Sequence, residues 1–189
     1  MKKQLLVLLM AITTSTFFSC QKVSPVELDN NDGKIGFDIN KVDTENCPAT
    51  TVTLVAGQHI DAGTVSVTND ANYIYVTYTT ANGYLLTQTH LFVGACNLVP
   101  VNNQGNPVPG QFPYANTHNN ITSYTYQLPV SAIGLGNCGC IAAHAVVVKL
   151  NESGQVIEQQ TGWGNGIRIN PNGGNWGMKF NFCTCVIDL

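Results

Sequence analysis

Three features of the sequence predict an all-β fold. After residue 50, about eight short stretches rich in Val, Thr, Tyr and Ile alternate with Gly, Asn and Pro. No stretch keeps a helical period of 3.6 residues, so the helical crossovers that a parallel sheet needs are missing. Hydrophobic residues make up 44% of the chain and charged residues 10%, which favours a buried core over disorder. We therefore predict a single antiparallel β-sandwich or jelly roll of about eight strands.

The expected strands are runs of β-branched and aromatic residues between turn signals. In chain order they are Thr51–Val55, Thr64–Thr68, Tyr73–Thr80, Tyr84–Val93, Thr122–Leu128, Ile141–Leu150, Gln155–Thr161 and Trp176–Cys183. Glu152-Ser153-Gly154 predicts a hairpin turn between the sixth and seventh strands. The segment Cys96–Asn120 is rich in Pro and Asn, and predicts a long loop that Phe112 and Tyr114 hold against the domain.

Asn82-Gly83 predicts a two-residue hairpin turn, because both residues tolerate the positive φ angles of a type I′ turn. Counting outward from this turn, Tyr75 would face His90, and Gln88 would lie on the same face because strand side chains alternate. That face is aromatic and polar, the mixture expected where a sheet meets water or a ligand. Its expected members are Tyr73, Tyr75, Thr77, Thr79, Leu86, Gln88, His90 and Phe92. The opposite, more aliphatic set is expected to face the core: Ile74, Val76, Tyr78, Leu85, Thr87, Thr89, Leu91 and Val93.

The N-terminus has the features of an export signal. Lys2 and Lys3 precede an apolar run of about 14 residues, which is too short to span a bilayer. The run ends in Phe17-Phe18-Ser19-Cys20, which resembles the lipobox of bacterial lipoproteins. We therefore expect residues 1–19 to be a lipoprotein signal peptide and Cys20 to be lipidated. A plain secretory signal cleaved nearby is the alternative.

Residues 20–46 are expected to form a lipidated cysteine and a flexible tether, and residues 47–189 the folded domain. The tether carries six of the chain's eleven acids and has no sustained period of 2 or 3.6 residues. Several acyl chains on one cysteine give stable membrane anchoring. The predicted location is therefore the bacterial cell envelope, most simply the outer membrane. Whether the domain faces the surface or the periplasm stays open.

The cysteines of the domain are expected to form disulfides rather than a metal site. Without Cys20, an even number remains: Cys47, Cys96, Cys138, Cys140, Cys183 and Cys185. Cys138/Cys140 and Cys183/Cys185 each have C-x-C spacing, which differs from the C-x₂₋₄-C spacing that is usual in zinc sites. Six cysteines allow fifteen connectivities, and the sequence does not choose among them.

Several function classes are disfavoured by charge and by missing motifs. Only Lys149, Arg168 and Lys179 are cationic after residue 50, too few to neutralise a run of nucleic-acid phosphates. The four histidines form no H-x-H or H-E-x-x-H string, and no G-x-S-x-G string is present. We therefore predict no nucleic-acid partner, no metal and no cofactor. His144, which has alanines on both sides, is expected in or near the core.

A hydrolase is the weaker of two functional hypotheses. Hydrolysis of a glycosidic bond needs two carboxyl groups at a defined separation. Asp70 and Glu152 lie at expected turns, so Asp61 and Glu158 are the pair left to serve, with His59 as a partner. Nothing in the sequence indicates that the three are close together.

A non-catalytic binding module is the leading hypothesis. Trp163 and Trp176 both lie in stretches rich in Gly and Asn, where an aromatic ring can stack on a sugar and amides can bind its hydroxyls. The alternative for each tryptophan is a core anchor. Arg168, the only arginine, could bind a carboxylate or pair with Glu158. The candidate ligand-binding residues are Trp163, Trp176, Arg168, Tyr75, His90 and Gln88.

Four strings resemble a domain of unknown function in secreted and lipid-anchored proteins of Bacteroidota and other bacteria. They are Ala56–Gly63, Gly110–Tyr114, Ile141–Val147 and the Trp163-Gly164 … Asn175-Trp176 ending. The resemblance would cover about residues 51–182, and it implies a β-rich, extracellular domain without any known activity. We expect a membrane-anchored module that binds a glycan or an envelope or extracellular protein. A purely structural or assembly lipoprotein, marked by a large exposed apolar patch, is the third possibility.

Overall fold

A computed structural model describes residues 49–134 and 138–184 of the 189-residue chain. The predicted signal peptide, Cys20 and the expected tether lie outside the described residues, as do Cys47 and Cys185. Among the described residues, no helix is both long and apolar enough to cross a membrane. All of the described residues fall within the predicted folded domain.

The domain is all-β, as predicted, with almost no helix. Its strands are β1 (Thr50–Ala56), β2 (Ile60–Asn69), β3 (Tyr73–Thr80), β4 (Leu85–Gly94), β5 (Tyr114–Ile121), β6 (Ser123–Pro129), β7 (Cys138–Leu150), β8 (Val156–Gly164), β9 (Ile167–Arg168) and β10 (Met178–Cys183). The one described α-helix, α1 (Val130–Ile133), and the 3₁₀-turn η1 (Pro109–Gln111) are single turns. Each of the eight predicted strands overlaps one of these strands.

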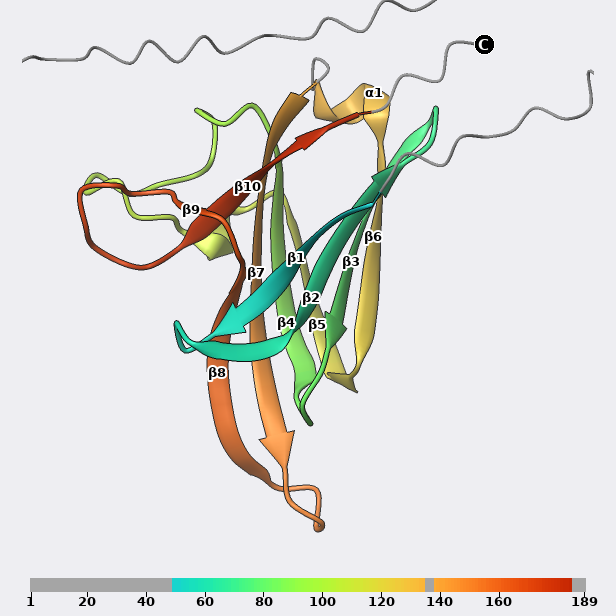
Figure 1. The fold of residues 1–189 in the computed structure, drawn as a ribbon, viewed down its shortest axis with the longest axis vertical. Coiled ribbons are helices and arrows are strands. Elements are labelled where there is room, and N and C mark those ends of the chain that lie inside the picture. Colours follow the sequence, from blue (N-terminus) through green and yellow to red (C-terminus); the bar gives the residue numbers. More distant parts are fainter. Residues whose placement is uncertain (1–48, 135–137, 185–189) are drawn as a thin grey trace, which may run out of the picture. The chain divides into compact units, whose positions relative to one another are not determined.

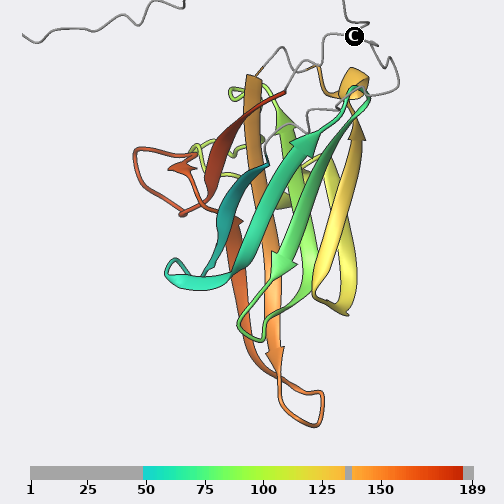
Figure 2. The same cartoon turned by 45° about the vertical axis from the view of Figure 1, so that its right-hand side comes forward.

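Eight strands form one antiparallel sheet in the order β5-β4-β7-β8-β1-β2-β3-β6, which curls into a nearly closed, barrel-like shape (Figure 1). The predicted division into the two sheets of a sandwich is not clearly present. The edge strands β5 and β6 follow each other in the chain and meet through side chains. Asn116 Nδ2 donates to the Tyr124 hydroxyl at 2.6 Å. The long strand β7 pairs β10 at its start and β8 farther on (Figure 2).

The predicted β3–β4 hairpin is wrong, although its turn exists. Asn82 and Gly83 have φ of 56° and 79°, and Tyr84 N donates to Ala81 O at 3.0 Å. After this turn the strands separate, because β3 pairs β2 and β6 whereas β4 pairs β5 and β7. The Tyr78 hydroxyl reaches the His90 carbonyl oxygen at 3.1 Å, so the two strands face each other across the core.

The predicted core face holds for β3 and only in part for β4. Ile74, Val76 and Tyr78 are fully buried, as expected. On β4 the register shifts between Leu86 and Gln88 in both ladders, which marks a β-bulge. The extra residue reverses the alternation. Leu86 is therefore buried, against the prediction, while Thr89, Leu91 and Val93 are buried in agreement with it.

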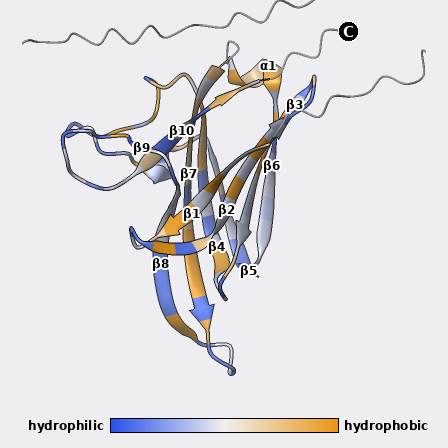
Figure 3. Ribbon diagram, viewed as in Figure 1, coloured by the Kyte–Doolittle hydropathy of each residue, from blue (hydrophilic) through white to orange (hydrophobic). Residues whose placement is uncertain are grey.

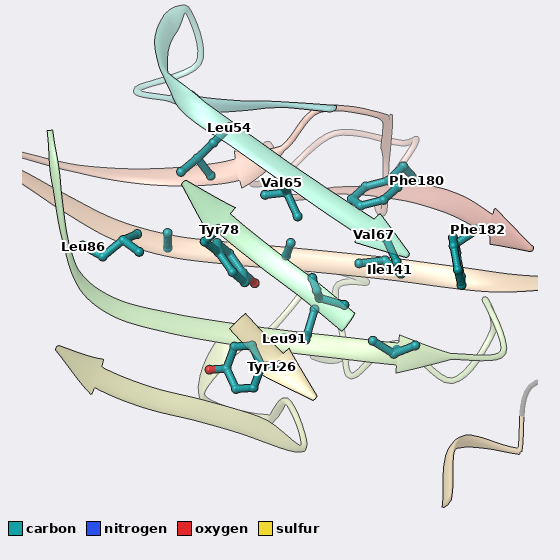
Figure 4. Close-up of a cluster of buried hydrophobic side chains, with 14 of the residues drawn as sticks. Leu54, Val65, Val67, Tyr78, Leu86, Leu91, Tyr126, Ile141, Phe180 and Phe182 are labelled. Carbon is teal, nitrogen blue, oxygen red and sulfur yellow. The ribbon is translucent and has the colours of Figure 1, made fainter. Parts of the chain in front are cut away.

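The inner faces of the strands supply one hydrophobic core. Apolar segments alternate with polar ones on several central strands, whereas β5 and β6 are mostly polar or neutral in hydropathy (Figure 3). Leucine, valine and aromatic side chains from strands far apart in sequence meet in this core (Figure 4). A second, smaller cluster is built from Phe92, Val99, Phe112, Ala142 and Trp163. Phe112 is 5% exposed, so the segment after β4 packs against the sheet as predicted.

Strand β5 lies within the segment predicted to be a loop. Its sequence, Tyr-Ala-Asn-Thr-His-Asn-Asn-Ile, has few strong strand formers, and it pairs only β4. An edge strand can be polar because it pairs with a neighbouring strand on one side only and its other side faces solvent. His118, expected in a loop, therefore stands on a strand, where its Nε2 lies 2.8 Å from Thr89 Oγ1.

Two disulfides tie the first residues of β7 to neighbouring segments. Cys96–Cys140 links the segment after β4 to β7, and Cys138–Cys183 links β7 to the end of β10. Four of the six predicted disulfide cysteines are thus paired. The turn at residues 152–154 joins β7 and β8 as predicted, with Gly154 at φ 77°.

Candidate functional site

Trp176, Arg168 and His59 line one surface hollow of about 410 Å³, which we call the Trp176 hollow. The complete lining is Val55, Gln58, His59, Asn165, Arg168, Trp176 and Met178. Two of the predicted ligand-binding residues, Trp176 and Arg168, are therefore neighbours in space. His59 reaches them from the turn between β1 and β2, where Gln58 has φ 75°.

Loops and short strands hold the Trp176 hollow in place. Arg168 on β9 is paired in register with Met178 on β10. This approach needs glycine at position 166, because a Cβ there would collide with the Lys179 carbonyl oxygen. The segment before Trp176 is fixed by Asn106, whose Oδ1 accepts from Asn175 N at 3.0 Å. Asn106 and Asn175 therefore build the loop, and Asn175 is not the free amide expected from the sequence.

Polar side chains without described partners remain around the Trp176 ring. Gln58, His59 and Asn165 are exposed, and the described residues offer their side chains no hydrogen bond. Arg168 is exposed as well, and its guanidinium has no ion pair or hydrogen bond among residues 49–134 and 138–184. The hollow thus combines a half-buried aromatic ring with unused donors and acceptors.

Trp163 is a core anchor and does not line the hollow. It is 4% exposed and packs edge-on against Phe112, with ring centroids 6.1 Å apart. Its Gly-Asn neighbourhood resembles that of Trp176, so the sequence does not separate the two. The pairing of β8 with β7 makes Trp163 the buried tryptophan, because it places Trp163 beside His144.

Gln88 and His90 line a second hollow, of about 340 Å³, which we call the His90 hollow. Its other lining residues are Ala115, Asn116 and Thr117 on β5. Tyr75, predicted to lie on the same face, is elsewhere because β3 does not pair β4. The Tyr75 hydroxyl donates to Asp70 Oδ2 at 2.8 Å, and this bond raises the tyrosine's pKa. Asp70 also caps the β2–β3 turn, as backbone bonds from Asn72 and Tyr73 lower its pKa.

His90 stands directly opposite His144 on the neighbouring strand β7. The two Nδ1 atoms are 3.2 Å apart. Burial lowers the pKa of His90, and burial together with the nearby His90 lowers that of His144 to about 3. Both imidazoles are therefore neutral at pH 7. The expected core position of His144 is confirmed at 8% exposure, but the sequence did not reveal its partner.

Asp61, Glu158 and His59 are not gathered into one cleft. Asp61 is paired with Val55, and Val55 with Trp163, which is five residues along β8 from Glu158. Five residues of strand span about 16 Å. Glu158 instead accepts from the Tyr84 hydroxyl at 2.7 Å and lies 3.8 Å from Lys149. The hydrogen bond from Tyr84 is the main cause of its lowered pKa, and Arg168 is not its partner.

No protein-family model, curated protein or solved structure matches this chain. The family resemblance drawn from the four sequence strings therefore stays a prediction. Within the described residues, no three His, Cys, Asp or Glu side chains converge as metal ligands. The two hollows and their lining residues are therefore the features that bear on function.

Proposed function

We propose that this chain is an exported, membrane-anchored lipoprotein whose domain binds a glycan at the Trp176 hollow without catalysis. The supporting observation is that Trp176, Arg168, Gln58 and Asn165 line one hollow while the polar groups of their side chains have no partners among the described residues. A partly exposed indole offers a flat apolar surface, and amides exchange hydrogen bonds with hydroxyl groups.

Export is supported by the cysteines. Disulfides persist in oxidising compartments outside the cytoplasm, and the described domain holds two. The proposed anchor is Cys20, placed after an apolar run with a positively charged start. If so, Cys20→Ser leaves the protein in the soluble fraction of the producing bacterium and abolishes incorporation of labelled palmitate. Retention of both label and membrane attachment in this variant would contradict the anchor.

The binding test is a glycan array probed with the full chain and with Trp176→Ala. Binding by the parent chain that is lost in a variant with unchanged unfolding behaviour supports the Trp176 hollow. Ile157→Ala is the matched control, because Ile157 is 64% exposed on β8 and does not line the hollow. Equal loss in both variants, or no loss in Trp176→Ala, contradicts the proposal.

A protein partner is the second candidate, favoured by two exposed apolar side chains. Leu98 is 66% exposed, and Ile167, next to Arg168 in sequence, is 61% exposed. Absence of binding to every arrayed glycan would favour this candidate. Cross-linking in the native envelope from a photoreactive residue at position 167 would then identify the partner.

A further inference from the structure

The His90–His144 pair has the spacing of two ligands on one metal ion. A tetrahedral ion with metal–nitrogen distances of 2.0–2.1 Å separates two ligand nitrogens by about 3.3 Å. The Nδ1 atoms of His90 and His144 are 3.2 Å apart. Because the residues are directly opposed on β4 and β7, the ladder fixes this spacing. Both nitrogens can bind the same ion once the shared proton is displaced and the rings turn so that their lone pairs converge.

We infer that His90 and His144 chelate a divalent transition-metal ion, Zn²⁺ by its geometry, next to the His90 hollow, which His90 lines and His144 does not. Imidazole is a ligand that Zn²⁺, Cu²⁺ and Ni²⁺ share, and a nitrogen pair at this spacing suits a tetrahedral ion. This metal site does not depend on the proposed glycan site, which is built from other residues.

The surroundings of the pair hold the two rings differently. His144 is 8% exposed and packs edge-on against Trp163, with ring centroids 4.9 Å apart, so its ring is fixed from behind. His90 is half-buried and lines the hollow, which leaves a route for an ion from solvent. Gln88 lines the same hollow and carries an amide oxygen, while water can fill the remaining positions. The Asn116 amide is already used, because its Oδ1 accepts from Thr117 N and its Nδ2 donates to Tyr124.

The proton shared between the two rings must move when an ion binds. Without metal, one Nδ1–H donates to the other Nδ1. On binding, the donor ring moves its proton to Nε2, so both Nδ1 lone pairs face the ion and no net proton is released.

The test is a Zn²⁺ titration of the full chain followed by NMR of its four histidine rings, with accessible thiols alkylated beforehand. We expect saturable, one-to-one changes in the His90 and His144 signals. His59 is the internal control, since it lines the Trp176 hollow, whereas His118 contacts Thr89 beside His90. Changes confined to His59 or His118, or no saturable change, would overturn the inference and leave the pair as a hydrogen bond alone.

Variants make the test independent of any one assignment. His90→Gln is expected to abolish the one-to-one binding measured by calorimetry, and His59→Gln to leave it unchanged. His144→Gln should also abolish binding, provided that this variant folds. If the His144 variant does not fold, the His90 variant decides, because His90 is partly exposed and its replacement disturbs the core less. Undiminished Zn²⁺ binding by folded His90→Gln contradicts a two-histidine site.

Discussion

Trp176 and His144 belong to regions of the domain that are built in opposite ways. Trp176 lies in a loop that asparagine side chains hold, and around it the side chains of Gln58, Asn165 and Arg168 have no partners among the described residues. His144 lies in the middle of β7, between β4 and β8, and each side of its ring is occupied. The Trp176 hollow therefore offers unused groups to a ligand, whereas the His90–His144 pair offers a fixed spacing.

The difference indicates how each region should respond to substitution. Changes in the loop-built hollow should alter binding more than stability, since Trp176 is only half-buried where it packs against the second cluster. Changes beside the histidine pair should destabilise the fold, because β4, β7 and β8 bury these side chains against one another. Four measurements test this contrast.

The largest effect is expected from Trp163→Ala compared with Trp176→Ala. Trp163 fills the second cluster with Phe92 and Phe112, so its removal should lower the free energy of unfolding by about 3–5 kcal/mol. Trp176 is half-buried, and its loss should cost clearly less. Urea unfolding with the disulfides intact measures both. Equal losses would show that the Trp176 hollow is as much a part of the core as the histidine region.

Removing the Cys138–Cys183 disulfide is expected to have the next largest effect. The bond joins residues 45 positions apart and ties β10 to the start of β7. The double variant Cys138→Ala/Cys183→Ala should lose about 3 kcal/mol of stability, because the unfolded chain is less constrained. Thermal unfolding measures the change. A melting temperature equal to that of the parent would mean that the β7–β10 ladder holds without the covalent link.

Acid should weaken the domain through His144. Its folded pKa of about 3 lies below the ordinary value, so between about pH 6.5 and 3 the unfolded chain binds a proton that the folded chain does not. Stability should therefore decrease as pH falls through this window. His144→Gln should flatten the decrease between pH 7 and 5, measured by urea unfolding with a chelator present. An unchanged slope would assign the effect to other groups, His90 first among them.

The smallest effect is expected from Thr89→Val. Thr89 is next to His90 in sequence, and its side chain lies on the inner face of β4. Thr89 Oγ1 lies 2.8 Å from both the Tyr126 hydroxyl and His118 Nε2, near the meeting of β5 and β6. Valine keeps the shape and loses these bonds, which should cost about 1 kcal/mol. Zn²⁺ binding should not change. A loss of several kcal/mol would mean that this hydrogen-bond network, more than side-chain packing, holds the two sheet edges together.

Local sequence patterns predicted where the strands lie in the chain but not which strands pair with each other. Stretches rich in Val, Thr, Tyr and Ile between turn residues located all eight strands of the prediction, and Tyr73–Thr80 agreed in both bounds. Asn82 and Gly83 predicted a turn because their backbone angles are local, whereas the pairing of β4 with β7 depends on residues far along the chain. The bulge beside Leu86 and the polar edge strand β5 gave no recognisable local signal.

The same limit applies to the site residues. Trp163 and Trp176 have similar neighbours in sequence, and only the ladder of β7 with β8 buries the first. His90 and His144 are 54 positions apart, so no spacing motif could connect them. Gln88 and His90 were predicted together correctly because they alternate on one strand. Tyr75 was added to them through a hairpin that does not exist.

The separation of β3 from β4 has a consequence for the order in which the domain can fold. The strands β1, β2 and β3 can pair as soon as they are made, but β1 and β4 must wait for β8 and β7. Contacts of such long sequence separation slow folding. During synthesis the N-terminal strands are made first, so Val76 and Tyr78 stay exposed to solvent until about half of the domain has been made after them.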